Sequence, residues 1–213
     1  MIRADVTTEP TQEAVSVEEL KDHLRITGSN EDTYLKRLAT AARRAAEVYL
    51  GKKLVDTTLV GYLPAIPSGE CFLLMPGPVR SITSIDYYAT DNTSQEWTSD
   101  DYTLDATGNI HRVYRNYGAS WPSATRTWNP ISAEWVAGYG ASRTAVPEDI
   151  RQAVLLLAAH LWAARQPADV ATEQIKTEHK ALLYPTARCT SGVWNERRPH
   201  ESPSSTAEPG QSG

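Results

Sequence analysis

Five histidines are the side chains of this chain best suited to metal binding, but their spacing does not predict a metal site. A zinc site requires ligands at short, recognisable spacings, and this sequence has no HExxH motif and no paired histidines. His160 lies beside Leu161 and Trp162, a setting more typical of a packed core histidine than of a ligand. The five are His23, His111, His160, His179 and His200. We therefore predict no metal site.

The cysteines and glycines give no catalytic motif either. Cys71 and Cys189 lie far apart without a partner motif, which argues against a disulfide scaffold or a zinc site. No GxSxG elbow occurs. Gly138-Tyr139-Gly140 lacks the third glycine and the lysine of a phosphate loop, so we interpret it as a turn between a strand and a helix. We predict no catalytic residue and no cofactor.

Acidic and aromatic residues gather in the middle of the chain, and each group has two interpretations. The acids could form a calcium site or a glycosidase pair, but their positions at expected turns favour turn formation. The tryptophans could form a sugar-stacking platform, but core packing is their commoner use. These residues are Asp86, Asp91, Asp100, Asp101 and Asp105, and Trp97, Trp121, Trp128 and Trp135.

The elements that must position these residues begin with a helical hairpin over residues 15–51. Ser16 followed by Glu19 is a capping-box pattern, and Ser29 followed by Asp32 repeats the signal for a longer second helix. Gly51 is expected to end that helix in a left-handed conformation. The second helix has an alanine-rich apolar face and a basic face.

Strand chemistry follows the hairpin. Valine, isoleucine, threonine and aromatic residues occur in short runs broken by Pro, Gly, Asp and Asn. Asp91-Asn92 and Thr107-Gly108-Asn109 mark turns between runs. The pattern predicts a small antiparallel sheet or sandwich, with strands over residues 54–62, 71–74, 82–89, 95–98, 102–104, 110–114 and 131–137.

Helix returns near Pro147, because proline and two acids suit the first turn of a helix. This helix is apolar nearly all round, which predicts a central core helix that ends at Pro167. A shorter helix is expected around residues 173–184. Residues 195–213 are rich in Pro, Ser and Gly and are expected to form a disordered tail.

Composition places the chain among soluble globular proteins. It has 213 residues, 40% of them hydrophobic, and a net charge of −5. No apolar run approaches the roughly 18 residues of a spanning helix, and no secretory signal is evident, so we expect a cytoplasmic protein without a membrane. Positive charge gathers on the second helix and its exit, either as a solvated face or as a contact for an acidic partner or nucleic acid. These residues are Lys36, Arg37, Arg43, Arg44, Lys52 and Lys53.

Several blocks in fixed order resemble the head-tail connector, or adaptor, proteins of tailed bacteriophages. The blocks are VSVEELKDHLRI, EVYLGKKL, MPGPVRSITSIDYY, YGASWP and EWVAGYGASRTAVPEDIRQAVLLLAAHLW. The resemblance spans residues 15–183. It depends on the order of several blocks rather than on one short motif.

The resemblance implies a mainly helical α+β fold, an α-helical bundle of about four helices with an inserted small antiparallel β portion and a disordered C-terminal tail. The adaptor domain would cover residues 15–194, with helices in 16–51 and 147–184 around a β-rich insertion at about 53–138. Residues 1–14 would be a flexible N-terminus.

The implied function is a non-enzymatic structural connector in the virion neck, assembled in the host cytoplasm. It would form a ring of about twelve subunits beneath the portal of the capsid. The ring would extend the channel for double-stranded DNA, which passes non-specifically, and would join a downstream neck, stopper or tail protein. We expect the free subunit to be a monomer.

A closed ring needs two unlike contact patches on each subunit. The alanine-rich second helix is one candidate interface, and an open sheet edge is a second. The candidate interface residues are Arg37, Ala42, Arg43, Arg44, Ala46 and Tyr49. A C-terminal arm is the candidate for portal binding, with folding back on its own subunit as an equal alternative. Its residues are Leu182, Leu183, Tyr184, Arg188, Val193 and Trp194.

Three other functions remain as alternatives. A β-rich carbohydrate-binding module is favoured by the tryptophans. A neck stopper or tail-completion protein is close to the leading hypothesis and is poorly separated from it by sequence. A hydrolase acting on cell wall or nucleic acid ranks last, because no residue pair stands out.

Overall fold

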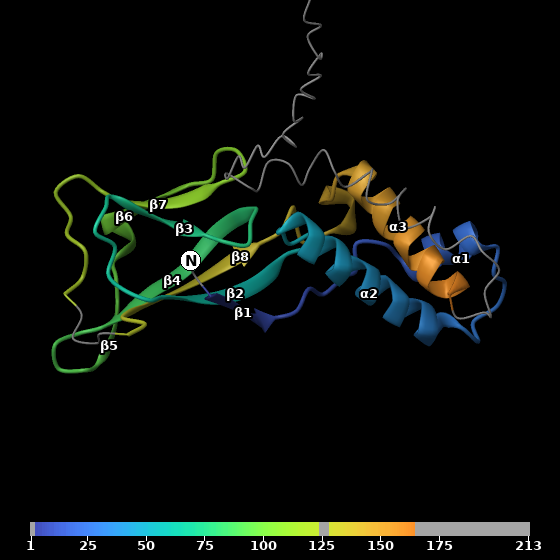
Figure 1. The fold of residues 1–213 in the computed structure, drawn as a ribbon, viewed down its shortest axis with the longest axis horizontal. Helices are drawn as coiled ribbons and strands as arrows, with labels where there is room; N and C mark the ends of the chain where they lie inside the picture. Colours follow the sequence, from blue (N-terminus) through green and yellow to red (C-terminus); the bar gives the residue numbers. More distant parts are fainter. Residues whose placement is uncertain (1–2, 124–127, 165–213) are drawn as a thin grey trace, which may run out of the picture.

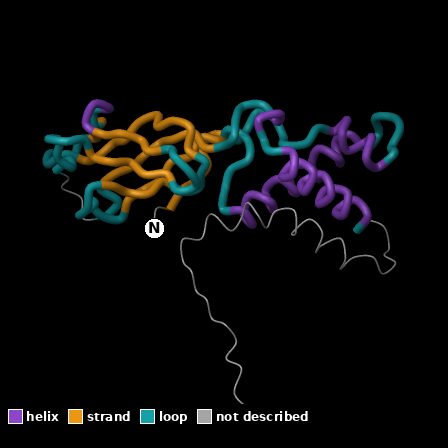
Figure 2. Tube along the Cα trace, turned by 90° about the horizontal axis from the view of Figure 1, so that it is seen from above, coloured by secondary structure: helices purple, strands orange, loops and turns teal. Residues whose placement is uncertain are grey.

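The computed structural model describes residues 3–123 and 128–164, and it shows an elongated molecule with helices at one end and strands at the other (Figures 1 and 2). The helices are α1 (Val17–Leu24), α2 (Asp32–Leu50) and α3 (Glu148–Ala163), with 3₁₀ turns η1 (Ser99–Asp101) and η2 (Arg143–Ala145). The strands are β1 (Arg3–Thr8), β2 (Thr57–Leu63), β3 (Cys71–Leu74), β4 (Val79–Tyr88), β5 (Ser94–Glu96), β6 (Tyr102–Asp105), β7 (His111–Arg115) and β8 (Ile131–Ala137).

The predicted helical bundle is wrong. The described residues form three α-helices and eight strands, and the strands make two antiparallel sheets. Helix and strand contents are therefore comparable. The strands are not a small insertion in a bundle, because they bury a separate apolar core of their own. The expected fourth helix, over residues 173–184, lies outside the described residues.

The two sheets face each other as a sandwich. One has the order β1-β2-β8-β4-β5 and the other the order β3-β7-β6. Alternate residues of β2 and β8 are buried, as expected for strands with one face on a core. Leu59 pairs with Trp135, and Trp135 pairs with Ile82. The core between the sheets contains Leu59, Leu63, Phe72, Leu74, Val79, Ile85, Trp97, Val113, Ile131 and Trp135.

The N-terminal segment, predicted to be flexible, forms β1. This strand pairs antiparallel with β2 from Arg3↔Tyr62 to Thr8↔Thr58. Its residues after Ala4 are exposed, so β1 has no apolar alternation that would reveal it in the sequence. The backbone hydrogen bonds offered by β2 hold it in place, and β1 becomes one edge of the larger sheet.

The helical end has a second core. Ala39, Ala42 and Ala46 of α2 are fully buried, and these small side chains allow α3 to pack closely. The α3 side of this core is formed by Ile150, Val154, Leu157 and Ala158, which confirms α3 as a core helix.

The helix ends follow the sequence signals in two places out of three. The capping box at α1 is confirmed, with Ser16 N donating to Glu19 at 2.7 Å and Glu19 N donating to the Ser16 hydroxyl at 3.1 Å. Gly51 ends α2 with a φ of 64°, as expected. Ser29 does not cap α2: the N-cap is Glu31, without a side-chain cap. The Ser29 carbonyl instead accepts from Asp32 N at 3.3 Å, which makes a turn.

Backbone hydrogen bonds join the two ends of the molecule. Lys53 N donates to the Gly77 carbonyl at 2.7 Å, and Tyr139 N donates to the Leu54 carbonyl at 3.1 Å. Gly138 has a φ of 148°, and a Cβ at this position would lie 2.5 Å from the backbone nitrogen of Asp56. The segment 138–140 is therefore a turn between β8 and the helical end, as predicted, and only glycine fits at its start.

Candidate assembly surfaces

Arg43 is the centre of a charge network on the inner side of α2. Its side chain is 2% exposed and reaches three carboxylates. Nε donates to Glu13 at 2.7 Å, Nη1 donates to Glu47 at 3.0 Å, and Nη2 lies 3.5 Å from Glu9. Glu9 and Glu13 belong to the link between β1 and α1. The network therefore fastens the N-terminal segment to α2.

The network keeps Arg43 charged although it is buried. Burial by itself lowers the pKa of Arg43, but the hydrogen bond to Glu13 and the charge of Glu47 outweigh it and raise the pKa above its ordinary value. Glu47 also accepts from Lys53 Nζ at 3.0 Å and from Leu54 N at 3.2 Å. Because the guanidinium of Arg43 and the carboxylate of Glu47 both have hydrogen-bond partners, their burial is compatible with a stable fold.

Half of the predicted interface on α2 is unavailable to another subunit. Ala42, Arg43 and Ala46 are each at most 2% exposed, because they face α3 and the N-terminal segment of the same chain. The alanine-rich face is thus an intramolecular contact, and the prediction of an exposed Arg43 is wrong. The other three predicted residues, Arg37, Arg44 and Tyr49, are exposed. No sequence spacing could pair Arg43 with Glu13, which lies thirty positions earlier.

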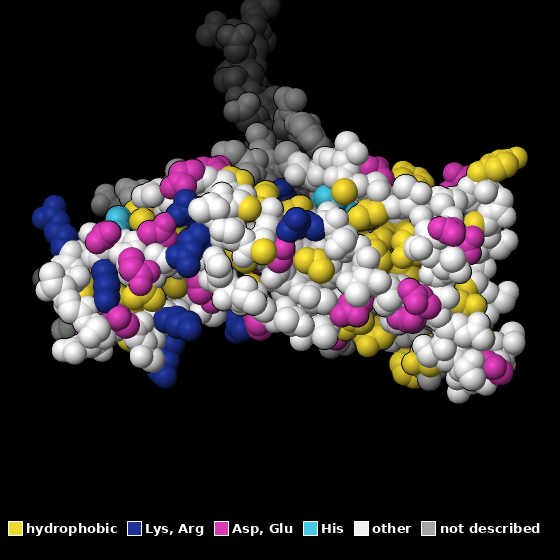
Figure 3. Space-filling model, turned by 180° about the vertical axis from the view of Figure 1, so that it is seen from behind, with side chains coloured by type: hydrophobic (Ala, Val, Ile, Leu, Met, Phe, Trp, Pro, Cys, Tyr) yellow, Lys and Arg dark blue, Asp and Glu magenta, His cyan; other side chains and the backbone are white. Residues whose placement is uncertain are grey.

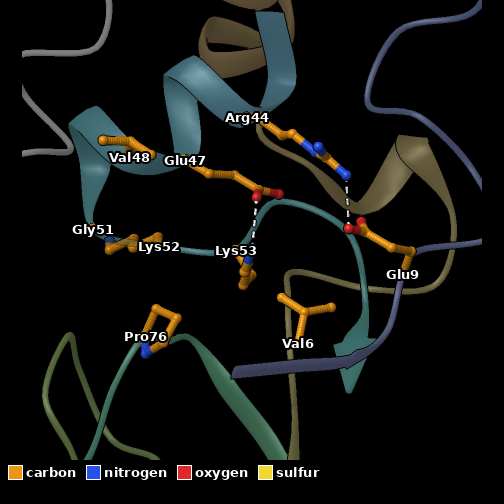
Figure 4. A pocket seen from close by; sticks show the side chains of 9 residues that line it. All are labelled: Val6, Glu9, Arg44, Glu47, Val48, Gly51, Lys52, Lys53 and Pro76. Atoms are coloured by element: carbon orange, nitrogen blue, oxygen red, sulfur yellow. Dashed lines mark hydrogen bonds and ion pairs between the residues drawn. The ribbon is translucent and has the colours of Figure 1, made fainter. Parts of the chain in front are cut away.

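A pocket of about 470 Å³ opens where α2 meets the sheets, and we call it the junction pocket (Figure 4). Its lining comes from β1, the end of α2 with its exit, and the link between β3 and β4. Val48 is 83% exposed and Val6 is 41% exposed, so apolar surface faces solvent here. The lining residues are Val6, Glu9, Arg44, Glu47, Val48, Gly51, Lys52, Lys53 and Pro76.

The charged groups of the junction pocket have partners within the subunit. Arg44 is 60% exposed and donates to Glu9 at 2.8 Å. Lys53 donates to Glu47, whose carboxylate is 4% exposed and turned into the network. Lys52 Nζ donates to Asn109 at 3.0 Å. The three cations outnumber the two carboxylates of the lining.

The two ends of one face of the molecule differ in charge. In Figure 3, Lys and Arg side chains lie among Asp and Glu side chains over the helices and the junction, whereas the sheet end shows mainly acidic and apolar side chains. Within residues 57–137, the acids are Glu70, Asp86, Asp91, Glu96, Asp100, Asp101, Asp105 and Glu134, against Arg80, Arg112, Arg115 and Arg126. A molecule with unlike ends is suited to heterologous contacts.

Asp91 and Asp105 form turns, as the sequence predicted, whereas Asp86 lies inside β4, where the turn prediction is wrong. Asp91 accepts from the hydroxyl and the amide of Thr93 at 2.6 and 3.0 Å, and Asp105 accepts from Thr107 N at 2.9 Å. These hydrogen bonds from the Thr93 hydroxyl and the Thr107 amide are the main cause of the lowered pKa of each carboxylate. Across residues 3–123 and 128–164, no three His, Cys, Asp or Glu side chains are grouped to hold a metal ion.

The tryptophans mostly pack in the sheet core rather than on a platform. Trp135 is fully buried and Trp97 is 4% exposed. Trp121 lies 5.0 Å from Trp97 between ring centroids and donates its indole N–H to the Gly69 carbonyl at 2.8 Å. Trp128 is exposed. The sugar-binding hypothesis loses the row of exposed tryptophans on which it depended.

His160 is buried in the helical end, and the prediction of a packed histidine is confirmed. His111 is buried at the junction, where it packs against Gly77. Burial first, and then the charge of Lys52, lower the pKa of His111 from 6.5.

Of the helices that the structure describes, none has both the length and the apolar character needed to cross a membrane.

The sequence matches the model of a known family over residues 14–112, from the start of the helical core to β7. That family is described as phage gp6-like head-tail connector proteins. Residues 14–112 are therefore similar to head-tail connectors. No curated protein matches the sequence of the connector.

Solved structures extend the likeness to nearly the whole connector. A chain from the neck of an empty GTA particle, computed with C6 symmetry, is 25% identical with a TM-score of 0.75, and the match covers 92% of the connector and 100% of that chain. A chain from the neck of a native GTA particle, computed with C12 symmetry, is 26% identical with a TM-score of 0.70, covering 93% and 100%.

A third match comes from the virion of a native gene transfer agent (GTA) particle. It is 27% identical with a TM-score of 0.72, and it covers 85% of the connector and 93% of that chain. The protein is therefore a structural head-tail connector, and its place is the virion neck of a tailed phage or a phage-like particle. The portal-binding arm of the connector remains a prediction: Leu182, Leu183, Tyr184, Arg188, Val193 and Trp194 lie outside the described residues.

Proposed function

We propose that the connector acts as a closed ring of about twelve copies that docks on the portal and prolongs the DNA channel toward the tail. The observation that carries this proposal is the likeness, over nearly the whole chain, to chains from GTA necks computed with C6 and C12 symmetry. Within this ring the connector needs no catalytic residue, because its task is to join two assemblies and leave the channel open.

The form of the subunit supports a ring with head-to-tail contacts. Its two ends differ in secondary structure, and its visible face in Figure 3 differs in charge from one end to the other. A heterologous contact joins two unlike surfaces and generates a ring when the rotation between copies closes. Exposed residues of α2, including Arg37, Arg44 and Tyr49, belong to the proposed contact between copies.

DNA passes through the channel without being held tightly. The net charge of −5 favours weak interaction with phosphate, because strong non-specific binding requires clusters of free cations. Arg43 is neutralised by its carboxylates, and Arg44 is paired with Glu9. We propose that the C-terminal arm, with Leu182, Leu183 and Tyr184, provides the apolar contacts to the portal.

The test is reconstitution of the full-length connector with the portal of the same particle, imaged by electron microscopy. We expect a ring on a ring, with about twelve copies of the connector. A chain that ends at residue 180 is the matched variant, and we expect it to fold and to lose portal binding. A connector that binds only after another ring occupies the portal would be a stopper, and the proposal would fail.

A further inference from the structure

A groove of about 400 Å³ lies between α1 and α3, and we call it the helical groove. Part of its lining is apolar, since it includes Val15, which is 3% exposed, and Leu155, which is half-buried. The same lining carries three carboxylates, on Glu19, Asp22 and Glu148. Such a groove suits a long basic side chain, because the alkyl stem can cover the apolar part while the charged head reaches a carboxylate.

The acidic charge of the helical groove exceeds the charge that the subunit itself neutralises. Arg151 is the one arginine or lysine among the described residues of the lining. It pairs with Glu19 and also with Glu148, the latter at 2.6 Å. Asp22 is exposed, and its carboxylate has no ion pair within residues 3–123 and 128–164. The groove therefore offers an unpaired carboxylate to a cation from outside.

A stripe of exposed residues runs along α2, and we call it the α2 stripe. Its members are Arg37, Ala41, Ala45 and Val48, which recur at helical spacing. All four are exposed, and Val48 is 83% exposed although it is apolar. The side of α2 that faces α3 is buried in the helical core instead. The α2 stripe therefore faces away from α3 and has small or apolar side chains beyond Arg37.

Arg37 differs from the next two arginines of α2 because it is not neutralised. Arg43 is paired with Glu13, and Arg44 is paired with Glu9. In the part of the chain that the structure describes, the Arg37 side chain has no ion pair and no hydrogen bond. A free guanidinium is complementary in charge and geometry to a free carboxylate.

We propose that the α2 stripe of one connector packs against α1 and α3 of the next copy in the ring, with Arg37 in the helical groove and paired with Asp22. The occupant is a second copy, because the stripe faces away from α3 in its own subunit. In Figure 1, α2 borders one side of the helical end and α1 borders the other. The contact thus joins two unlike surfaces, as a ring requires. This inference rests on the proposed ring and names the surfaces that close it.

The first test is a charge exchange, measured as the connector concentration at which half of the portals carry a ring in electron micrographs. Arg37→Glu places two carboxylates together and should raise that concentration roughly tenfold or more. Adding Asp22→Arg to the same chain restores an opposite pair and should restore ring formation. Adding Asp100→Arg instead gives the same net charge at an exposed site of the sheet end, and it should not restore rings.

The second test is cross-linking, which does not depend on charge. Ala41→Cys on the stripe and Gln152→Cys in the groove are combined with Cys71→Ser and Cys189→Ser. A short bismaleimide is used because it tolerates more geometries than a disulfide does. We expect a ladder of covalent dimers, trimers and larger species. The single-cysteine chains should give dimers at most, and Ala41→Cys with Thr107→Cys, an exposed site of the sheet end, should give no ladder.

The ring and the contact are judged separately. If the unmodified chain forms no rings on the portal, the proposed function fails. If it forms rings and Arg37→Glu forms them equally well, the contact is wrong and the proposed function stands. The same conclusion follows if Asp22→Arg restores no more rings than Asp100→Arg, or if the Ala41 and Gln152 cysteines give no ladder.

Discussion

The helical end and the sheet end of the connector are stabilised by different kinds of interaction. The helical end buries a guanidinium and its carboxylates, with Arg43 at 2% exposure. The sheet end buries aliphatic and aromatic side chains, with Ile85 and Trp135 fully inaccessible. Among the described strands, one ionisable side chain is buried: His111, at the margin next to the junction.

The difference shows how each end reaches a unique arrangement. Buried and exposed side chains alternate along strands such as β2 and β8. This alternation fixes the register in which a strand pairs with its neighbour, because a slip of one residue would turn the apolar face of the strand outward. The N-terminal segment has no such pattern, and its position on α2 depends on Glu9 and Glu13 meeting Arg43. We infer that charge pairing places this segment, while apolar packing places the strands.

The largest expected effect is that of Arg43→Met. This change leaves Glu13 and Glu47 without their buried cation, which should lower the free energy of unfolding by about 3–5 kcal/mol. Urea unfolding followed by circular dichroism measures the loss. Arg44→Met, one residue later on the exposed side of α2, is the control and should cost less than about 1 kcal/mol. If the Arg43 variant and the unmodified chain had equal free energies of unfolding, the charge network would not be what stabilises the helical end.

Ile85→Ala tests the sheet end, with Thr83→Ala as an exposed control on the same strand. Loss of a fully buried isoleucine should cost about 2–5 kcal/mol, and the control should stay within about 0.5 kcal/mol. Hydrogen exchange of the backbone amides shows which elements each substitution destabilises. We expect faster exchange in β4 and β8 for Ile85→Ala, and in α2 for Arg43→Met. Identical exchange maps would show that the two ends unfold as one unit, which would break the comparison.

The smallest effect concerns His111. Its lowered pKa means that the folded state favours the neutral ring, so the unfolded chain binds more protons below pH 6.5. Stability from this group is therefore complete above pH 6.5 and is lost as the pH falls below that value. His111→Gln should remove this part of the pH dependence, measured as the difference in unfolding free energy between the two chains. A difference that does not change with pH would show that His111 does not titrate in this way.

Local signals in the sequence predicted the elements that depend on near neighbours. Ser16 and Glu19 cap α1, Gly51 ends α2, and the strand runs fall close to β2 through β8. Resemblance predicted the connector family correctly but also suggested a helical bundle, which was wrong. The bundle failed because the strands pair with one another and bury their own core, a consequence of distant pairing that periodicity does not reveal.

The sequence alone determined the helices and strands from α1 to α3, though not β1, because capping, glycine and alternation act over a few residues. Tertiary structure decided which side chains remain free for assembly. It buried Ala42, Arg43 and Ala46, placed β1 on the sheet edge, and left Val48 and Tyr117 exposed. The physical reason is that burial depends on contacts between residues such as Glu13 and Arg43, thirty positions apart, and local pattern carries no information about such pairs.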